Sequence, residues 1–163
     1  MSVNLKQHKY ISIIYLIGGA IGAIMFLPQV AHSPGNILSM FATIILFLQI
    51  IASLYGGWKF LKNEAIGIQT LYWVSISCIP VISFPLLSYW AYFGAGLFPT
   101  LSVGSFSGFN FNFNFGYGSQ LWIFPDESGL TFGINIVALI LMLTIKKIMH
   151  SNQIPFWPVK AKA

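Results

Sequence analysis

The chain has 163 residues and a formal net charge of +5, and 56% of its residues are hydrophobic while only 7% are charged. Its mean hydropathy is +0.78, whereas a soluble domain normally carries about a quarter charged residues. This composition excludes an ordinary water-soluble domain and predicts an integral membrane protein. The positive charge comes from lysines in widely spaced pairs beside apolar runs, which is not the pattern of a nucleic-acid-binding surface.

Four long apolar runs predict four membrane-spanning helices, since about 20 apolar residues are enough to cross the hydrocarbon core. The runs cover about residues 10–30, 37–60, 65–93 and 130–149. A secretory signal is the alternative for the first run, but its apolar region is usually only about 7–15 residues long. Pro80 and Pro85 predict a kink or tilt in the third helix. We therefore expect one domain, an all-α integral membrane bundle of four transmembrane helices.

The lysines predict how these helices are oriented. If the chain crosses the membrane four times, every lysine falls on the same side: Lys6, Lys9, Lys59, Lys62, Lys146, Lys147, Lys160 and Lys162. Lysines are enriched in cytoplasmic loops. We therefore expect a protein of the cytoplasmic membrane with both termini in the cytoplasm, including a tail over residues 150–163.

An aromatic segment over residues 94–129 lies between the third and fourth predicted helices. Within it phenylalanine alternates with asparagine, a period of two that predicts a β-strand with a phenyl face and an amide face. Because a lone strand is not stable, residues 98–103 and 120–124 are its candidate partners in a small external hairpin or meander. The residues predicted to dock against lipid or a partner protein, two options left open here, are Phe109, Phe111, Phe113, Phe115, Tyr117 and Trp122.

Small residues spaced four apart predict close helix packing, because each pair lies on one helix face and lets another backbone approach. The residues expected to pack in this way are Gly18, Gly22, Ala52, Gly56, Gly129 and Gly133.

Catalytic and metal-binding signals are missing from the sequence. His8, His32 and His150 all fall outside the apolar runs, so no metal or haem site is expected. Asp126 and Glu127 are adjacent and cannot face each other as an acid and base pair on a helix. We expect no catalytic residue and no intrinsic cofactor, which leaves room for a bound lipid or quinone.

The sequence therefore predicts a non-catalytic accessory or structural subunit of a multisubunit membrane complex, such as an energy-converting, respiratory oxidase-like assembly. Its expected partners are other membrane protein subunits and membrane lipid, not nucleic acid. One alternative is a self-assembling channel or small-solute pore lined by polar residues such as Gln49 and Asn135. Another is a membrane protein that acts on lipid or quinone.

Overall fold

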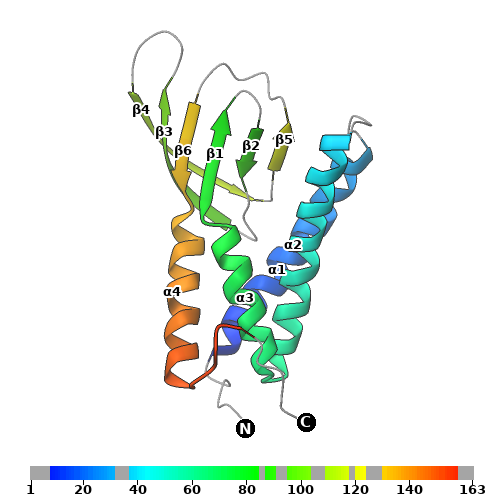
Figure 1. Ribbon diagram of the computed structural model, residues 1–163, viewed down its shortest axis with the longest axis vertical. Helices are drawn as coiled ribbons and strands as arrows, with labels where there is room; N and C mark the ends of the chain where they lie inside the picture. Colours follow the sequence, from blue (N-terminus) through cyan, green and yellow to red (C-terminus); the bar gives the residue numbers. More distant parts are fainter. Residues whose placement is uncertain are drawn as a thin grey trace.

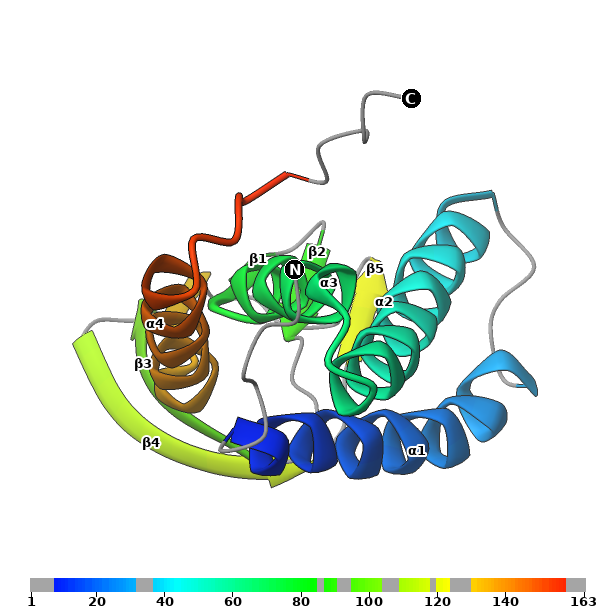
Figure 2. The same ribbon diagram turned by 90° about the horizontal axis from the view of Figure 1, so that it is seen from below.

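Two shorter helices lie below a six-stranded sheet, and two longer helices extend from the same end of the molecule to the level of the sheet (Figure 1). The computed structural model describes residues 8–31, 37–84, 87–90, 95–103, 109–117, 120–123 and 130–157. The helices are α1 (Lys9–Ala31), α2 (Ile37–Leu61), α3 (Ala65–Ser77) and α4 (Ile136–Ser151). Seen from below, α3 lies between α2 and α4, and α1 runs alongside α2 (Figure 2).

Helices α1 and α2 lie where the first two apolar runs predicted them. Within them, Lys9–Phe26 and Thr43–Leu61 are long and apolar enough to span a membrane. That finding rests on length and composition alone, and a buried core helix or a signal sequence meets the same criteria. Among the described residues these are the two candidate spans, where the sequence predicted four.

The third apolar run does not form one long helix. Helix α3 ends at Ser77, and strands β1 (Pro80–Phe84) and β2 (Leu87–Trp90) follow it. Pro80 has no backbone N–H and disfavours a helical conformation at the residue before it. Pro80 therefore does not kink a continuing helix, because it already lies in a strand, and Pro85 lies outside the described residues. The predicted helix over residues 65–93 is wrong for the described residues beyond Ser77.

The fourth apolar run also divides into a strand and a helix. Strand β6 (Leu130–Ile134) precedes α4. Its large apolar residues alternate with Thr131 and Gly133, and it pairs with β1 and β3 on either side. Asn135 separates the two elements, and its side-chain oxygen accepts a hydrogen bond from the backbone N–H of Ala138 at 3.2 Å. The predicted helix over residues 130–149 therefore begins six residues late.

The remaining strands are β3 (Ala95–Val103), β4 (Phe109–Tyr117) and β5 (Gln120–Ile123). The sheet has the order β4-β3-β6-β1-β2-β5, and every neighbouring pair is antiparallel. The Phe/Asn strand and its pairing with residues 98–103 are confirmed, whereas β5 pairs with β2 instead of β4. The prediction of an all-α bundle of four transmembrane helices is wrong, since the fold joins four helices to an antiparallel sheet and has two candidate spans among its described residues.

The central strands have one apolar exposed face and one buried face. The exposed face carries Leu101, Val103, Leu130, Phe132 and Ile134. The buried positions alternate with them and include Val81, Ser83, Phe98 and Thr100. The register places Phe109 and Phe111 of β4 opposite Val103 and Leu101, and Asn112 opposite Thr100. The phenyl positions of β4 therefore belong to the apolar face of the sheet, because residues opposite each other in an antiparallel pair share a face.

Candidate functional site

The candidate functional site is a groove between α2 and α3. Glycines set the distance between these helices. A Cβ added at Gly67 would lie 2.2 Å from the backbone nitrogen of Phe60, and one added at Gly56 would lie 2.9 Å from Cδ2 of Leu71. The two helices are therefore in close contact at the α2–α3 turn, where Lys59 and Glu64 form an ion pair at 2.8 Å.

A small hydrogen-bond network lies at the sheet end of the groove. The Gln49 side-chain amide donates to Ser77 Oγ at 3.1 Å and to the Tyr89 hydroxyl at 2.7 Å. The Tyr89 hydroxyl donates in turn to the backbone oxygen of Ser77 at 2.7 Å. Burial raises the pKa of Tyr89 to about 12, so this hydroxyl keeps its proton at neutral pH. The network joins α2, α3 and β2, with both amide hydrogens of Gln49 used inside the protein.

The segment after α4 crosses α3 at the other end of the groove. Gln69 donates to the backbone oxygen of Pro155 at 2.7 Å, and the Trp73 indole N–H donates to the backbone oxygen of Phe156 at 3.2 Å. The rings of Trp73 and Trp157 lie 4.5 Å apart between centroids. These contacts hold the aromatic end of the segment against α3.

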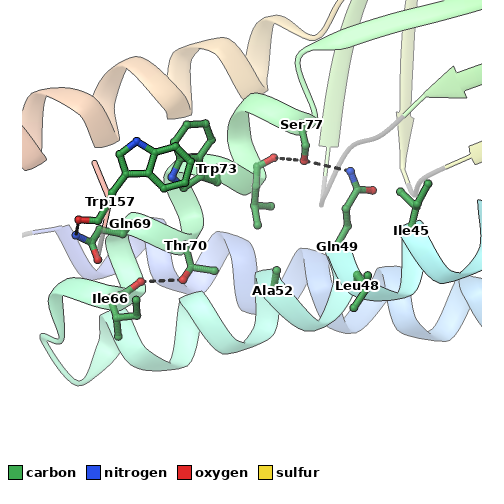
Figure 3. Close-up of a pocket in the computed structure, with 11 residues that line it drawn as sticks. Ile45, Leu48, Gln49, Ala52, Ile66, Gln69, Thr70, Trp73, Ser77 and Trp157 are labelled. Atoms are coloured by element: carbon green, nitrogen blue, oxygen red, sulfur yellow. Dashed lines mark hydrogen bonds between the residues drawn. The ribbon is translucent and has the colours of Figure 1, made fainter. Parts of the chain in front are cut away.

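Between these two ends lies a pocket of about 510 Å³ (Figure 3). This volume is within the range of about 300–1,000 Å³ that is usual for ligand sites. Figure 3 shows Trp157 and Gln69 at one end and Gln49 and Ser77 at the other. The lining residues are Ile45, Leu48, Gln49, Ala52, Ile66, Gln69, Thr70, Trp73, Val74, Ser77 and Trp157. None of them is ionisable, so the pocket suits an uncharged and largely apolar group.

The small residues predicted to pack helices lie in different environments. Gly18 and Gly22 are buried in α1, Gly56 contacts α3, and Ala52 lines the groove. Gly133 lies in β6, where an added Cβ would be 2.7 Å from Cγ2 of Thr100, so it allows close packing within the sheet instead of between helices. Gly129 lies outside the described residues.

Two further glycines, each four residues from another small residue in the sequence, also lie at helix contacts: Gly19 against Leu54 and Gly57 against Leu16. The glycine contact that sequence reasoning missed is Gly67 against the α2 backbone. The residues four positions from Gly67 are Asn63 and Leu71, so the spacing of small residues gave no signal there.

The predicted docking residues fall on two strands at opposite edges of the sheet. Phe109, Phe111, Phe113, Phe115 and Tyr117 lie on β4, whereas Trp122 lies on β5. The backbone therefore does not bring all six together, and β4 alone carries the phenylalanine series.

The histidines and acids form no cluster in the part of the chain that the structure describes. No group of three or more His, Cys, Asp or Glu side chains that could hold a metal ion occurs among those residues. His8 lies beside Tyr10 at the start of α1, and His150 is exposed in the last turn of α4. His32, Asp126 and Glu127 lie outside the described residues.

Compared with models of known protein families, with curated protein sequences and with solved structures, the chain gives no significant match.

Proposed function

We propose that this protein is a non-catalytic accessory subunit of a membrane protein complex, anchored by α1 and α2 and docked to its partner through β4 and the apolar face of the sheet. The observation that carries this proposal is the open edge of an apolar-faced sheet next to two long apolar helices. The complex that we propose for it is an energy-converting, respiratory oxidase-like assembly.

The surface of α1 and α2 supports membrane insertion. Large apolar side chains are exposed along both helices, with Ile24 exposed by 69% and Phe41 by 61%. Their 23 and 25 residues give lengths of about 35 and 38 Å at about 1.5 Å per residue. The hydrocarbon core is about 30 Å thick, so either helix can cross it.

The lysines support one orientation. Helix α1 begins with Lys9 at the end of the molecule where α2 ends with Lys59, and α4 ends there with Lys146 and Lys147 in its last turns (Figure 1). By the positive-inside rule this end faces the cytoplasm. We therefore propose the cytoplasmic membrane as the location, with the chain entering α1 and leaving α4 on the cytoplasmic side.

The sheet supports a protein partner. Helices α3 and α4 have 13 and 16 residues, which gives lengths of about 20 and 24 Å. Both are shorter than α2, so the sheet that adjoins them begins beside the far part of α2. On one edge α2 lies against β5. On the other edge β4 pairs with β3, and no strand that the structure describes lies beyond it. Open edges in an apolar environment need a hydrogen-bonding partner, and a strand from another subunit provides one.

The test is mild solubilisation followed by cross-linking and mass spectrometry of the stoichiometric partner. Phe132→Ser should release the partner, because Phe132 lies on the apolar face of the sheet and is 49% exposed. Ile140→Ser is the matched control, because it removes a similarly exposed apolar side chain from α4. Both variants should stay in the membrane fraction after alkaline carbonate washing.

Hydrogen exchange gives an independent readout of the same docking. The β4 amides should exchange slowly in native membranes and faster in the purified chain. A protein that purifies alone as a monomer under mild conditions, with β4 exchanging equally fast in both states, would overturn the proposal.

The pore alternative receives less support from the described residues. Asn135 is 1% exposed and caps α4, while both amide hydrogens of Gln49 are bonded to Ser77 and Tyr89. These two side chains stabilise junctions between elements, which is a different task from lining a polar path.

A further inference from the structure

We propose that the α2–α3 groove holds one acyl chain of an anionic phospholipid, with the headgroup at the lysine-bearing end of the helices. This inference rests on the membrane insertion proposed above and is independent of partner docking. It adds a specific lipid site to the apolar surface that faces the bilayer in general.

The shape of the groove favours an extended chain. Its α3 wall runs from Ile66 to Ser77 along one helix face, a distance of about 16 Å at about 1.5 Å per residue. The α2 wall is made by residues from Ile45 to Ala52, again on one face. The space of about 510 Å³ is therefore drawn out along the helices, as a single hydrocarbon chain requires.

The walls offer little to a polar ligand. Thr70 Oγ1 already donates to the backbone oxygen of Ile66 at 2.8 Å, and Ser77 Oγ donates to that of Val74 at 2.8 Å. The Gln69 amide donates to the backbone oxygen of Pro155 at 2.7 Å. At the sheet end the Gln49 Oε1 atom is buried and has no hydrogen-bond partner in the part of the chain that the structure describes. A sugar or nucleotide has many more polar groups than this acceptor can serve and would lose most of its hydration here without replacement. A hydrocarbon chain has no hydrogen-bonded water to lose.

The two ends of the groove differ, which gives the chain a direction. The Gln49–Ser77–Tyr89 network lies at the sheet end. The opposite end carries the paired rings of Trp73 and Trp157, and tryptophan is enriched at the level of lipid headgroups. The headgroup therefore belongs at the Trp73–Trp157 end.

The charge at that end favours an anion. Lys62, Lys146 and Lys147 are exposed at this end of the molecule. Among the described residues the acidic side chain is that of Glu64, and it is paired with Lys59 at 2.8 Å. The local excess of positive charge attracts anionic lipid headgroups.

The direct test is native mass spectrometry of the full chain, purified in mild detergent and exposed to vesicles of phosphatidylglycerol and phosphatidylcholine in equal parts. The wild type should retain one phosphatidylglycerol. Ala52→Trp fills the groove and should lower the retained fraction at least about tenfold, since Ala52 lines it. Ala20→Trp adds the same bulk at an exposed position of α1 and should leave retention unchanged.

A second substitution tests whether the site prefers an anionic headgroup. Lys62→Gln should lower the preference for phosphatidylglycerol about fivefold, the factor expected for one interfacial lysine. Equal retention of the two phospholipids by the wild type would overturn the anionic assignment. Displacement of the phospholipid by an added prenyl quinone would overturn the acyl chain as occupant.

A fluorescence measurement covers the case in which Ala52→Trp does not fold. One brominated phosphatidylglycerol per chain in detergent should quench the wild type, and Trp157→Phe should remove a larger part of that quenching than Trp58→Phe. Trp58 is the control for the acyl chain because it does not line the groove. Its ring centroid lies 3.7 Å from the Lys62 Nζ atom, so it lies beside the proposed headgroup and not beside the brominated chain. Equal loss in the two variants would refute the site. Failure of the wild type to remain in carbonate-washed membranes would instead refute the proposed function.

Discussion

Replacing Gly67 by alanine should force α2 and α3 apart at their turn. The new Cβ would lie 2.2 Å from the nitrogen of Phe60, 2.7 Å from its Cα and 2.7 Å from the carbonyl carbon of Lys59. All three atoms belong to the backbone, so no rotamer change can relieve the contact. At Gly56 the two nearest atoms are instead Cδ2 and Cγ of Leu71, at 2.9 and 3.1 Å, and a rotamer change can move them. The third is Cβ of Thr70 at 3.1 Å.

Two opposing effects determine how far Gly67→Ala changes the free energy of unfolding. Alanine is favoured over glycine inside a helix by about 1 kcal/mol, while inserting a methyl group into a packed site costs about 1–3 kcal/mol. The backbone contacts at Gly67 place its cost at the upper end, so Gly67→Ala should lower the free energy of unfolding by about 2 kcal/mol. At Gly56 the two effects should nearly cancel.

The assay is reversible unfolding in mixed micelles, followed by tryptophan fluorescence, with Gly56→Ala as the matched variant. Gly67→Ala should unfold at a clearly lower denaturant concentration than the wild type, and Gly56→Ala close to it. Equal midpoints for the two variants would show that the backbones of α2 and α3 are not in the contact described.

Three further changes follow from other contacts. Asn135→Ala should cost about 1 kcal/mol of unfolding free energy by removing the cap on Ala138, and Asn135→Ser should recover most of it in the same unfolding assay. Tyr15→Phe removes the buried hydrogen bond to Ser75 and should cost a similar amount, about 1 kcal/mol; an unchanged midpoint would contradict that contact. Burial raises the pKa of the Cys78 thiol to about 12, so maleimide labelling at pH 8 should be slow in the folded chain and fast after denaturation, and equal rates would refute the buried placement.

The parts of the fold that could be predicted from the sequence are those with an unambiguous period or length. The first two apolar runs are long and uninterrupted, and they become α1 and α2. The alternation from Phe109 to Phe115 has a period that only a strand satisfies, and it becomes β4. In both cases the local pattern and the final structure agree.

The third and fourth runs were misread because apolar composition does not separate a buried strand from a buried helix. Residues 80–84 and 130–134 are as apolar as a membrane helix, yet they pair with each other as β1 and β6. A signal was present in the order of the residues. Ser83 and Ser88 each stand between two larger apolar residues, which is an alternation with the period of a strand. Both serines lie on the buried face of the sheet.

The groove could not be predicted for a different reason. Its walls come from α2, α3 and the segment that carries Trp157, so it depends on how segments far apart in the sequence meet. The spacing of Gln69, Trp73 and Ser77 indicates a shared helix face, but nothing local indicates that Pro155 and Phe156 supply the acceptors for Gln69 and Trp73.

The junction at Ile79 and Asn135 has a mechanical consequence. Chain segments α3–β1 and β6–α4 change from helix to strand at the same level, and the N–H of Asn135 donates to the oxygen of Ile79 there at 2.8 Å. The two segments are thus joined at this hydrogen bond, and they run side by side from the lysine-bearing end of the helices to the sheet. A tilt of the sheet would therefore shift α3, and with it one wall of the α2–α3 groove.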